Sequence, residues 1–493
     1  MLPPLIRRAG QSNRYTADPR ANGLRAKSLR SKNARLKNVR SMDPRANERG
    51  VTIALVATAM VAMISMAALS IDIGTLYQAK AEAQRTADVA ALTAARVISI
   101  SGITGDPNNI SGAWTTTCGG PASTATLAAL AIAQSSQNFV AGAAAGSVVV
   151  NYGAGSTPGT TNSCVGVSNF AVNPVVTVTV KQSNLPIFFA RVFSLVGGNP
   201  TSTSMSGTAS AEAFNPSGSG SVSGMVPVQP RCVKPWIVPN SDPQHLTAGG
   251  FVNTSAGTIS SQGVWPNGVI DESFTLTSTC NPASGVCNLG SNPPVAPGGG
   301  LLQYVPGAVT GTPGAIPACA TDPYQEAIAG CDQSTVYACG TPLGAEVDLS
   351  ENPIRTPPST GDTASGIECL TNLAANGTVG GPADELVAAT YPFQIEAGSS
   401  NPLVNPGGVV PYQAPITVSN SIVTIPIYDS SIGPLGPNSK VTIVGFLQVF
   451  INQLNADGSF NVTVMNVAGC GNNAANAPVS GTSPVPVRLI TPP

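Results

Sequence analysis

Residues 51–71 read VTIALVATAMVAMISMAALSI, a run of 21 residues without Asp, Glu, Lys, Arg, His, Asn or Gln. As an α-helix this run would be about 31 Å long, because each helical residue rises about 1.5 Å. The hydrocarbon core of a bilayer is about 30 Å thick. A core helix of a soluble protein rarely runs this far without a charged face. The run therefore predicts a transmembrane helix.

Positive charge is concentrated before this run. Residues 1–50 carry 13 Lys and Arg against three acids, whereas residues 72–493 carry 10 basic and 21 acidic residues. Positively charged flanks stay in the cytoplasm, so we expect a cytoplasmic N-terminus and an extracytoplasmic C-terminal region. A cleaved signal peptide would have a shorter apolar stretch of about 7–15 residues. The run is therefore interpreted as an uncleaved signal anchor.

The basic arm, residues 1–50, lacks apolar periodicity and is expected to be disordered. It could bind the phosphates of a nucleic acid, but membrane topology explains its charge, so no nucleic-acid partner is expected. The arm contains DPRAN twice, at residues 18–22 and 43–47, and Met42 precedes the second copy. Translation could therefore start at Met1 or at Met42.

The helical pattern continues past the apolar run to about Ile98. Alanines recur in it at three- and four-residue spacing, which gives one face of small side chains. These residues are Ala79, Ala83, Ala87, Ala90, Ala91 and Ala94. We expect this face to pack on a second helix of the same chain, near residues 122–145, or on a partner protein.

Residues 71–77 read IDIGTLY and residues 84–92 read QRTADVAAL. After an apolar helix that follows Gly50, these stretches resemble the N-terminal segment of the TadE/TadG-like proteins of Flp (tight adherence) pilus assembly. The chain departs from the family pattern at Ala83, where Leu is usual, and at Thr93. The matching positions are Asp72, Gly74, Leu76, Tyr77, Gln84, Asp88, Ala90, Ala91 and Leu92.

The resemblance extends to a strand, a short helix and a second strand further on. Residues 175–182 (VVTVTVKQ) and 202–213 (STSMSGTASAEA) alternate as strands do. Residues 185–193 (LPIFFARVF) have the pattern of a short amphipathic helix between them. This order is similar to the body of Tad-type proteins, which implies a structural protein of the bacterial inner membrane with pilus-assembly proteins or pilins as partners.

A flexible linker is expected at residues 216–224 (PSGSGSVSG). It would separate an α/β exported domain, residues 72–215, from a β-rich exported domain, residues 225–493. The chain has 52 Gly and 43 Pro and only 10% charged residues, a composition typical of many turns and short strands. Four β-branched runs, at 421–428, 440–451, 459–467 and 485–490, predict one antiparallel sheet that the last run closes.

All ten cysteines follow the apolar run, as structural disulfides in an oxidising compartment require. The connectivity does not follow from the sequence. The closely spaced pairs Cys280/Cys287 and Cys331/Cys339 are the candidate disulfides. The chain has no CxxC and a single histidine, His245, so neither zinc nor redox catalysis is expected.

No motif indicates catalysis or a cofactor. His245 lies in a loop-like stretch, and the chain has no G-x-S-x-G and no phosphate-binding glycine motif. Residues 348–352 (DLSEN) approach the Asp-x-Ser-x-Ser of a von Willebrand A metal site but end in Asn. The acidic pairs Asp271-Glu272 and Asp384-Glu385 look like solvated turn residues. We therefore expect no enzyme, no metal and no small-molecule substrate.

These observations predict an α+β protein: one transmembrane helix continuing into an Ala-rich helix, then a β-rich, disulfide-containing exported region. The expected function is structural, assisting the assembly or anchoring of an Flp-type pilus. A surface adhesin or other extracytoplasmic binding protein is one alternative. A minor pseudopilin is another, although prepilins normally have Glu at the fifth apolar position, where this chain has Leu55.

Overall fold

The computed structural model of this chain describes most of the sequence after residue 44. The described residues are 45–135, 145–155, 157–183, 185, 204–215, 227–245, 249–281, 286–287, 300–311, 313, 322–351, 362–372, 382–387, 391–404, 408–431, 435–436, 438–471, 479–481 and 483–490. The disorder predicted for residues 1–44, the short helix expected after Leu185 and the linker at 216–224 lie outside these ranges. The chain divides into two compact units, Met1–Ile64 and Ser65–Pro493.

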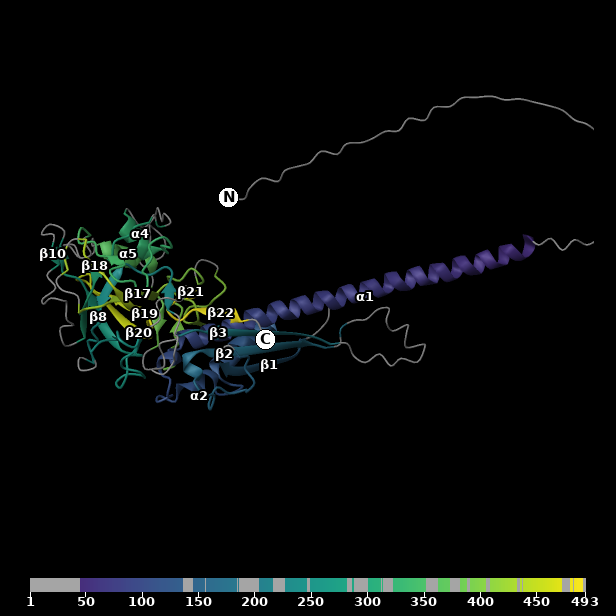
Figure 1. Ribbon diagram of the computed structural model, residues 1–493, viewed down its shortest axis with the longest axis horizontal. Helices are drawn as coiled ribbons and strands as arrows, with labels where there is room; N and C mark the ends of the chain where they lie inside the picture. The colour runs from purple at the N-terminus through teal and green to yellow at the C-terminus, as the bar shows by residue number, and fades with distance from the viewer. Residues whose placement is uncertain are drawn as a thin grey trace, which may run out of the picture. The chain divides into compact units, whose positions relative to one another are not determined.

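Helix α1 runs without a break from Arg45 to Ile100 (Figure 1). It contains both the apolar run and the predicted helical extension. It also begins inside the stretch expected to be a disordered arm, so that boundary was wrong for residues 45–50. Ala46, Glu48 and Arg49 are good helix formers, and they allow the helix to start before the apolar run.

A four-stranded antiparallel sheet follows α1, in the order β1-β2-β3-β22. Its strands are β1 (Ala145–Ala154), β2 (Pro174–Gln182), β3 (Met205–Ala213) and β22 (Val487–Ile490). Strands β2 and β3 confirm the two alternating runs predicted before the linker. They pair from Val175–Glu212 to Gln182–Met205.

The sheet shares one hydrophobic core with the C-terminal part of α1 and with α2 (Ala113–Cys118) and α3 (Thr124–Ser135). Alanines from α1 and α3 meet valines of β2 and alanines of β3 in this core. Small side chains on both helices let backbones approach closely. The small-residue face of α1 therefore packs within the chain, as one of the two sequence-based expectations had it.

A second sheet has seven strands in the order β11-β8-β20-β19-β17-β5-β12. Its central strands β17, β19 and β20 are antiparallel, whereas β5 runs parallel to β17 and β11 parallel to β8. The strands are β5 (Trp236–Pro239), β8 (Ser273–Thr277), β11 (Leu301–Gln303), β12 (Val305–Pro306), β17 (Ile422–Tyr428), β19 (Ile443–Leu454) and β20 (Phe460–Gly469).

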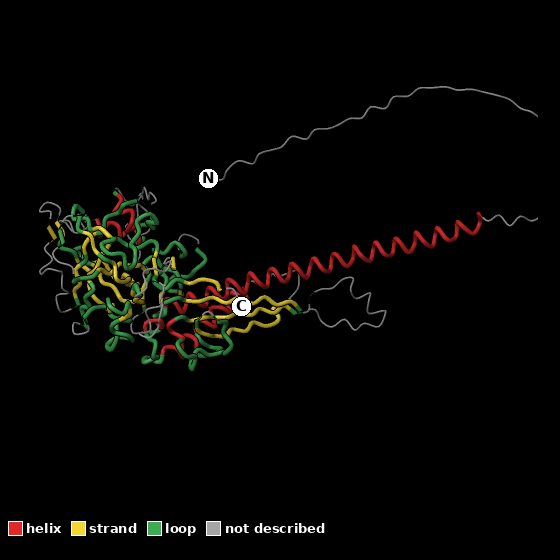
Figure 2. Tube along the Cα trace, in the orientation of Figure 1, coloured by secondary structure: helices red, strands yellow, loops and turns green. Residues whose placement is uncertain are grey.

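Short elements and loops accompany the two sheets (Figure 2). The helical ones are η1 (Ile103–Gly105), η2 (Phe170–Val172), α4 (Pro323–Ala329) and α5 (Asp362–Leu370). Of these, η2 packs beside the four-stranded sheet. The paired short strands are β4 (Val228–Pro230) with β21 (Val479–Gly481), β6 (Val252–Asn253) with β7 (Thr258–Ile259), β9 (Cys280–Asn281) with β10 (Val286–Cys287), β13 (Ala345–Glu346) with β18 (Lys440–Val441), and β14 (Glu385–Leu386), β15 (Ile395–Glu396) and β16 (Pro415–Ile416) together. The mixed α+β class is confirmed.

The final strand corrects the predicted topology. We expected it to close the C-terminal sheet, but β22 pairs with β3 in the four-stranded sheet. The side chains of Arg488 on β22 and Glu212 on β3 form an ion pair across this pairing. The division of Ser65–Pro493 at residues 216–224 stays a prediction, with β22 assigned to its N-terminal part.

Three disulfides join described cysteines: Cys118–Cys164, Cys232–Cys331 and Cys339–Cys470. The expected pairing of Cys331 with Cys339 was therefore wrong. Loops that are distant in sequence bring other cysteines closer than sequence spacing indicates. Cys280 is also disulfide-bonded, and its backbone lies opposite that of Cys287 in the β9–β10 pair. Pairing of Cys280 with Cys287 stays a prediction.

Candidate functional site

Two residues of the predicted family motif join helix α1 to strand β3. The Gln84 side chain donates from Nε2 to Thr208 O at 2.9 Å and accepts at Oε1 from Thr208 N at 3.2 Å. Nε2 also donates to Asp88 Oδ1 at 2.8 Å, one helical turn on. The Gln84 amide thus occupies both backbone groups of one strand residue, and Asp88 fixes its orientation. We call these three residues the Gln84 clamp.

A glycine makes this contact possible. A Cβ added at Gly207, beside Thr208, would lie 2.4 Å from Gln84 N and 2.5 Å from the Ala83 carbonyl carbon. Ala83 itself is completely buried. The family usually has Leu at this position, and here the strand backbone takes that space.

The other motif positions divide between the two sides of the helix. Ala90 and Ala91 are buried in the shared core, Leu92 packs against its edge, and Asp72 is also buried. Gly74 has no atom within 4 Å of an added Cβ, and the Tyr77 side chain is 72% exposed. Some motif residues therefore stabilise the fold, whereas the described part of the chain does not cover Gly74 and Tyr77.

The start of α1 is long and apolar enough to cross a membrane. Residues 52–64 are all exposed. They include large apolar side chains such as Ile53, Leu55 and Val61, each more than half exposed. A stretch of this kind is compatible with a helix that faces lipid.

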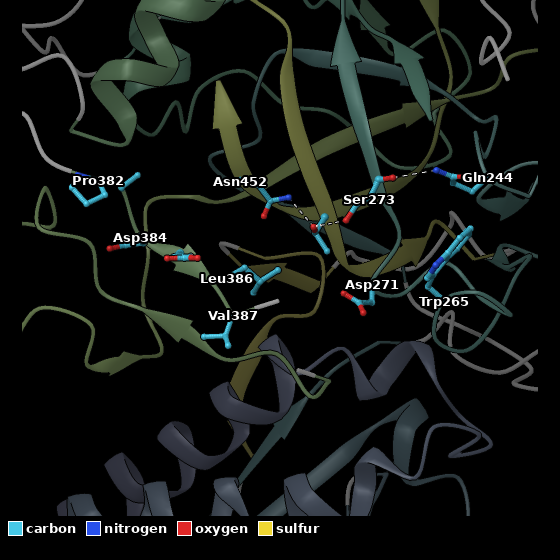
Figure 3. A pocket seen from close by; sticks show the side chains of 12 residues that line it. Gln244, Trp265, Asp271, Ser273, Pro382, Asp384, Leu386, Val387 and Asn452 are labelled. Carbon is cyan, nitrogen blue, oxygen red and sulfur yellow. Dashed lines mark hydrogen bonds between the residues drawn. The ribbon is translucent and has the colours of Figure 1, made fainter. Parts of the chain in front are cut away.

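A cleft of about 690 Å³ lies at the edge of the seven-stranded sheet. Gln244, Trp265, Asp271 and Asn452 lie along it, with Asp384 and Leu386 opposite (Figure 3). Its lining includes Asp271, Asp384 and Glu385, and none of the described residues that line it is basic. Asp384 is not solvated as expected, because it is buried and accepts hydrogen bonds from Gly398 N and Asn401 Nδ2.

Next to Gln244 and Trp265, three ionisable side chains converge: Asp242, His245 and Glu272. One ligand atom from each lies within 4.8 Å of the others. His245 Nδ1 is 3.0 Å from Asp242 Oδ2 and 3.5 Å from Glu272 Oε2. Its Nε2 is 3.0 Å from the carbonyl oxygen of Pro266. We call this group the His245 cluster.

Glu272 was expected to be a solvated turn residue, and that expectation was wrong. The side chain is completely buried, and neither carboxylate oxygen has a hydrogen-bond partner among the described residues. Burial, reinforced by the charge of Asp242, raises the pKa of Glu272 to about 9. The preceding residue, Asp271, has a positive φ of 68°, so the chain turns sharply at this point. A tight turn thus separates the two acidic side chains. Asp271 is half-buried at the cleft, and Glu272 lies inside the protein.

Other candidate chemistry from the sequence finds no support in the geometry. Asp348 follows a two-residue strand, and its Oδ1 accepts from Ser350 N at 2.8 Å and from the Ser350 hydroxyl at 2.5 Å. This is a local turn cap that occupies the carboxylate. Among the described residues, the carboxylates that approach His245 are those of Asp242 and Glu272.

Comparison with protein families gives one match. Residues 50–97 match the Tad family model, described as Flp pilus-assembly TadE/G-like. No curated protein and no solved structure matches the chain. The match covers α1 from Gly50 nearly to its end, including both halves of the Gln84–Asp88 contact. Residues 50–97 of this chain are therefore similar to the TadE/G-like Flp pilus-assembly family, and they are joined to a strand-rich body with three described disulfides.

Proposed function

We propose that this chain is a membrane-anchored, non-enzymatic protein that assists assembly or anchoring of an Flp-type pilus. The observation that carries the proposal is the family match over residues 50–97, which coincides with the helix that is apolar enough to span a membrane. Its charge distribution favours a single pass through the bacterial inner membrane, with the N-terminus in the cytoplasm. The disulfides favour an oxidising, extracytoplasmic location for the body.

The partner surface that we propose lies on α1 just beyond the apolar run. Ile73, Gly74 and Tyr77 lie on one helical face, because residues three and four apart are neighbours. Ile73 is 43% exposed, Tyr77 72% exposed, and Gly74 is open to close approach. Apolar and aromatic side chains around a glycine suit a second helix, such as that of a pilin or of another pilus-assembly protein.

The test is deletion of the gene in its own host, with pili counted by electron microscopy. We expect few or no pili in the deletion strain, and recovery when the full chain is restored. Tyr77→Ala and Gly74→Leu should fail to restore pili although the protein is present at normal level. Arg85→Ala, at an exposed position about 12 Å further along the same helix, is the control and should restore them. Normal piliation in the deletion strain would overturn the proposal.

Topology is tested separately. Protease added to spheroplasts should degrade the body and leave a fragment that contains the basic arm and the apolar run. Protection of the body would contradict the proposed orientation. In that case the extracytoplasmic role would be withdrawn.

An extracytoplasmic binding protein is the second candidate, and the acidic cleft favours it. A cleft of about 690 Å³ is large enough for a small ligand or for a segment of a partner protein. Glu385→Lys would reverse charge at this cleft without touching α1. Loss of adhesion with normal pilus number would favour the binding role, whereas loss of pili would tie the cleft to assembly.

A further inference from the structure

We propose that Asp242, His245 and Glu272 form a binding site for one divalent transition-metal ion, with Zn²⁺ as the best fit. The site is built from two separate parts of the chain. Asp242 and His245 lie in the loop that follows β5, and Glu272 directly precedes β8. Strands β5 and β8 are separated by three others in the seven-stranded sheet, so a bound ion would join two distant parts of its edge.

The hydrogen bond at Nε2 determines which nitrogen of His245 is free to bind. A carbonyl oxygen only accepts hydrogen bonds, so Nε2 carries a proton and donates it to Pro266 O. Nδ1 is then the nitrogen that faces both carboxylates. Metal-binding histidines commonly have this arrangement, with the second ring nitrogen donating to a backbone carbonyl.

A proton on Nδ1 would give a hydrogen bond to only one of the two carboxyl groups in the cluster. Such a proton would lie on the 3.0 Å line to Asp242 Oδ2. Glu272 would still be a buried carboxyl group without a hydrogen bond among the described residues. Burying a polar group without a hydrogen bond is costly. One divalent ion placed between the three side chains would be bound by all of them at once.

The distances are close to those of a filled site. Zn²⁺ binds nitrogen and carboxylate oxygen at about 2.0–2.2 Å, so ligand atoms in a tetrahedral site lie roughly 3.4 Å apart. The two measured separations from Nδ1 are 3.0 and 3.5 Å, and the third pair lies within 4.8 Å. Small side-chain rotations would bring the three ligand atoms to the separations of a tetrahedral site.

The donor types select the class of ion. Imidazole suits Zn²⁺ and neighbouring transition metals, whereas Ca²⁺ and Mg²⁺ prefer oxygen donors alone. Three protein ligands leave a coordination position for water. Asp271, which lines the adjacent cleft and precedes Glu272, would raise the local concentration of cations.

The test uses the full chain in detergent micelles, stripped with EDTA and then incubated with Zn²⁺ alone. After gel filtration, metal analysis should find about one Zn²⁺ per chain, and thermal unfolding should shift to higher temperature. Ca²⁺ or Mg²⁺ at the same concentration should produce no shift. A Co²⁺-loaded sample should show a visible absorption band.

Two variants locate the site. His245→Ala and Glu272→Gln should each weaken Zn²⁺ binding at least about tenfold and abolish the Co²⁺ band. Glu272→Gln replaces the carboxyl group by an amide of nearly the same shape, so it should fold even if His245→Ala does not. Glu385→Gln, at an exposed acid of the same cleft, is the matched control and should bind as the wild type does. No retained Zn²⁺ in the wild type, an equal response to Ca²⁺, or unchanged binding in Glu272→Gln would overturn the proposal.

Discussion

Thr104 Oγ1 donates a 2.9 Å hydrogen bond to Asn466 Oδ1, although the two residues are 362 positions apart in sequence. Asn466 Nδ2 donates in turn to Ser99 O at 2.5 Å and to Gln448 Oε1 at 2.9 Å. All four residues are buried. The end of the Tad-like helix is therefore attached to strands β19 and β20 by a polar network inside the protein.

Asn466→Ala should destabilise the body strongly. It removes the hydrogen bonds that the Ser99 carbonyl, the Thr104 hydroxyl hydrogen and Gln448 Oε1 make to this residue, whereas Thr104 Oγ1 still accepts from Asn215 Nδ2 and Gln448 Nε2 still donates to Ser483 Oγ. Each unsatisfied buried group costs about 1–3 kcal/mol, so we expect a loss of about 3 kcal/mol or more in the free energy of unfolding. Denaturant unfolding followed by tryptophan fluorescence measures it.

Asn452→Ala is the matched control for this change. Asn452 also lies in this sheet, on β19, and donates to Thr463 Oγ1, but its side chain is exposed. Water replaces that partner at little cost, so a change of no more than about 0.5 kcal/mol is expected. Equal effects of the two variants would show that the network does not stabilise the junction.

The sequence predicted where the helices and strands lie better than it predicted which strands and which cysteines pair. The uncharged run identified a helix that is long and apolar enough to span a membrane, and period-two alternation identified β2, β3, β17, β19 and β20. Alternation does not encode which edge a strand joins, so the pairing of β22 with β3 was missed. Cysteine spacing failed for the same reason, since Cys339 reaches Cys470 through the fold.

The His245 cluster shows a similar limit. The Asp242-x-x-His245 spacing is visible in the sequence, but Glu272 comes from the turn before another strand. The adjacent charge of Asp271 made the pair look solvated. Only the turn at Asp271, which has a positive φ, separates one side chain from the other. The Gln84–Thr208 contact was also invisible in the sequence, although the family motif includes Gln84.

Gly207→Ala should force α1 away from β3. The added methyl group would meet backbone atoms of Ala83 and Gln84 at 2.4–2.6 Å, and backbone cannot rotate away as a side chain can. Overpacking of this kind costs about 1–3 kcal/mol, and the Gln84 clamp would be lost as well. Thermal unfolding of the full chain in detergent measures the effect.

The control for Gly207 is Gly74→Ala. Gly74 lies in α1, the helix that Gly207 approaches, and it has open space around it. Ala is favoured over Gly in a helix by about 1 kcal/mol. The variant should therefore be as stable as the wild type or more so. A large loss of stability at Gly74 would mean that the chain itself packs against this position, which would remove the proposed partner surface.

The disulfides can be mapped directly. Peptides from the non-reduced protein should contain Cys232 crosslinked to Cys331 and Cys339 crosslinked to Cys470. A crosslink between Cys331 and Cys339 would contradict this connectivity. Cys339→Ser with Cys470→Ser removes a crosslink over 131 residues, for which we expect a loss of about 2–5 kcal/mol.

Lys234 predicts a dependence of stability on pH. Its Nζ is buried against the C-terminal end of α4 and donates to the carbonyl oxygens of Ile328 at 2.6 Å and Gly330 at 2.5 Å. Burial lowers the pKa of Lys234 to about 7, whereas an unfolded lysine has a pKa of about 10.4. Between these values the unfolded chain holds the extra proton, so the free energy of unfolding should rise with pH.

Lys234→Met isolates this contribution. It keeps the length of the side chain and removes the charge, so the rise above pH 7 should disappear, although the unpaired carbonyls lower stability at every pH. Lys80→Met, at an exposed lysine of α1, should retain the rise. If the wild type and Lys234→Met show parallel pH profiles between pH 7 and 10, the carbonyl oxygens hold Lys234 charged throughout. Burial would then be the weaker of the two effects on its pKa.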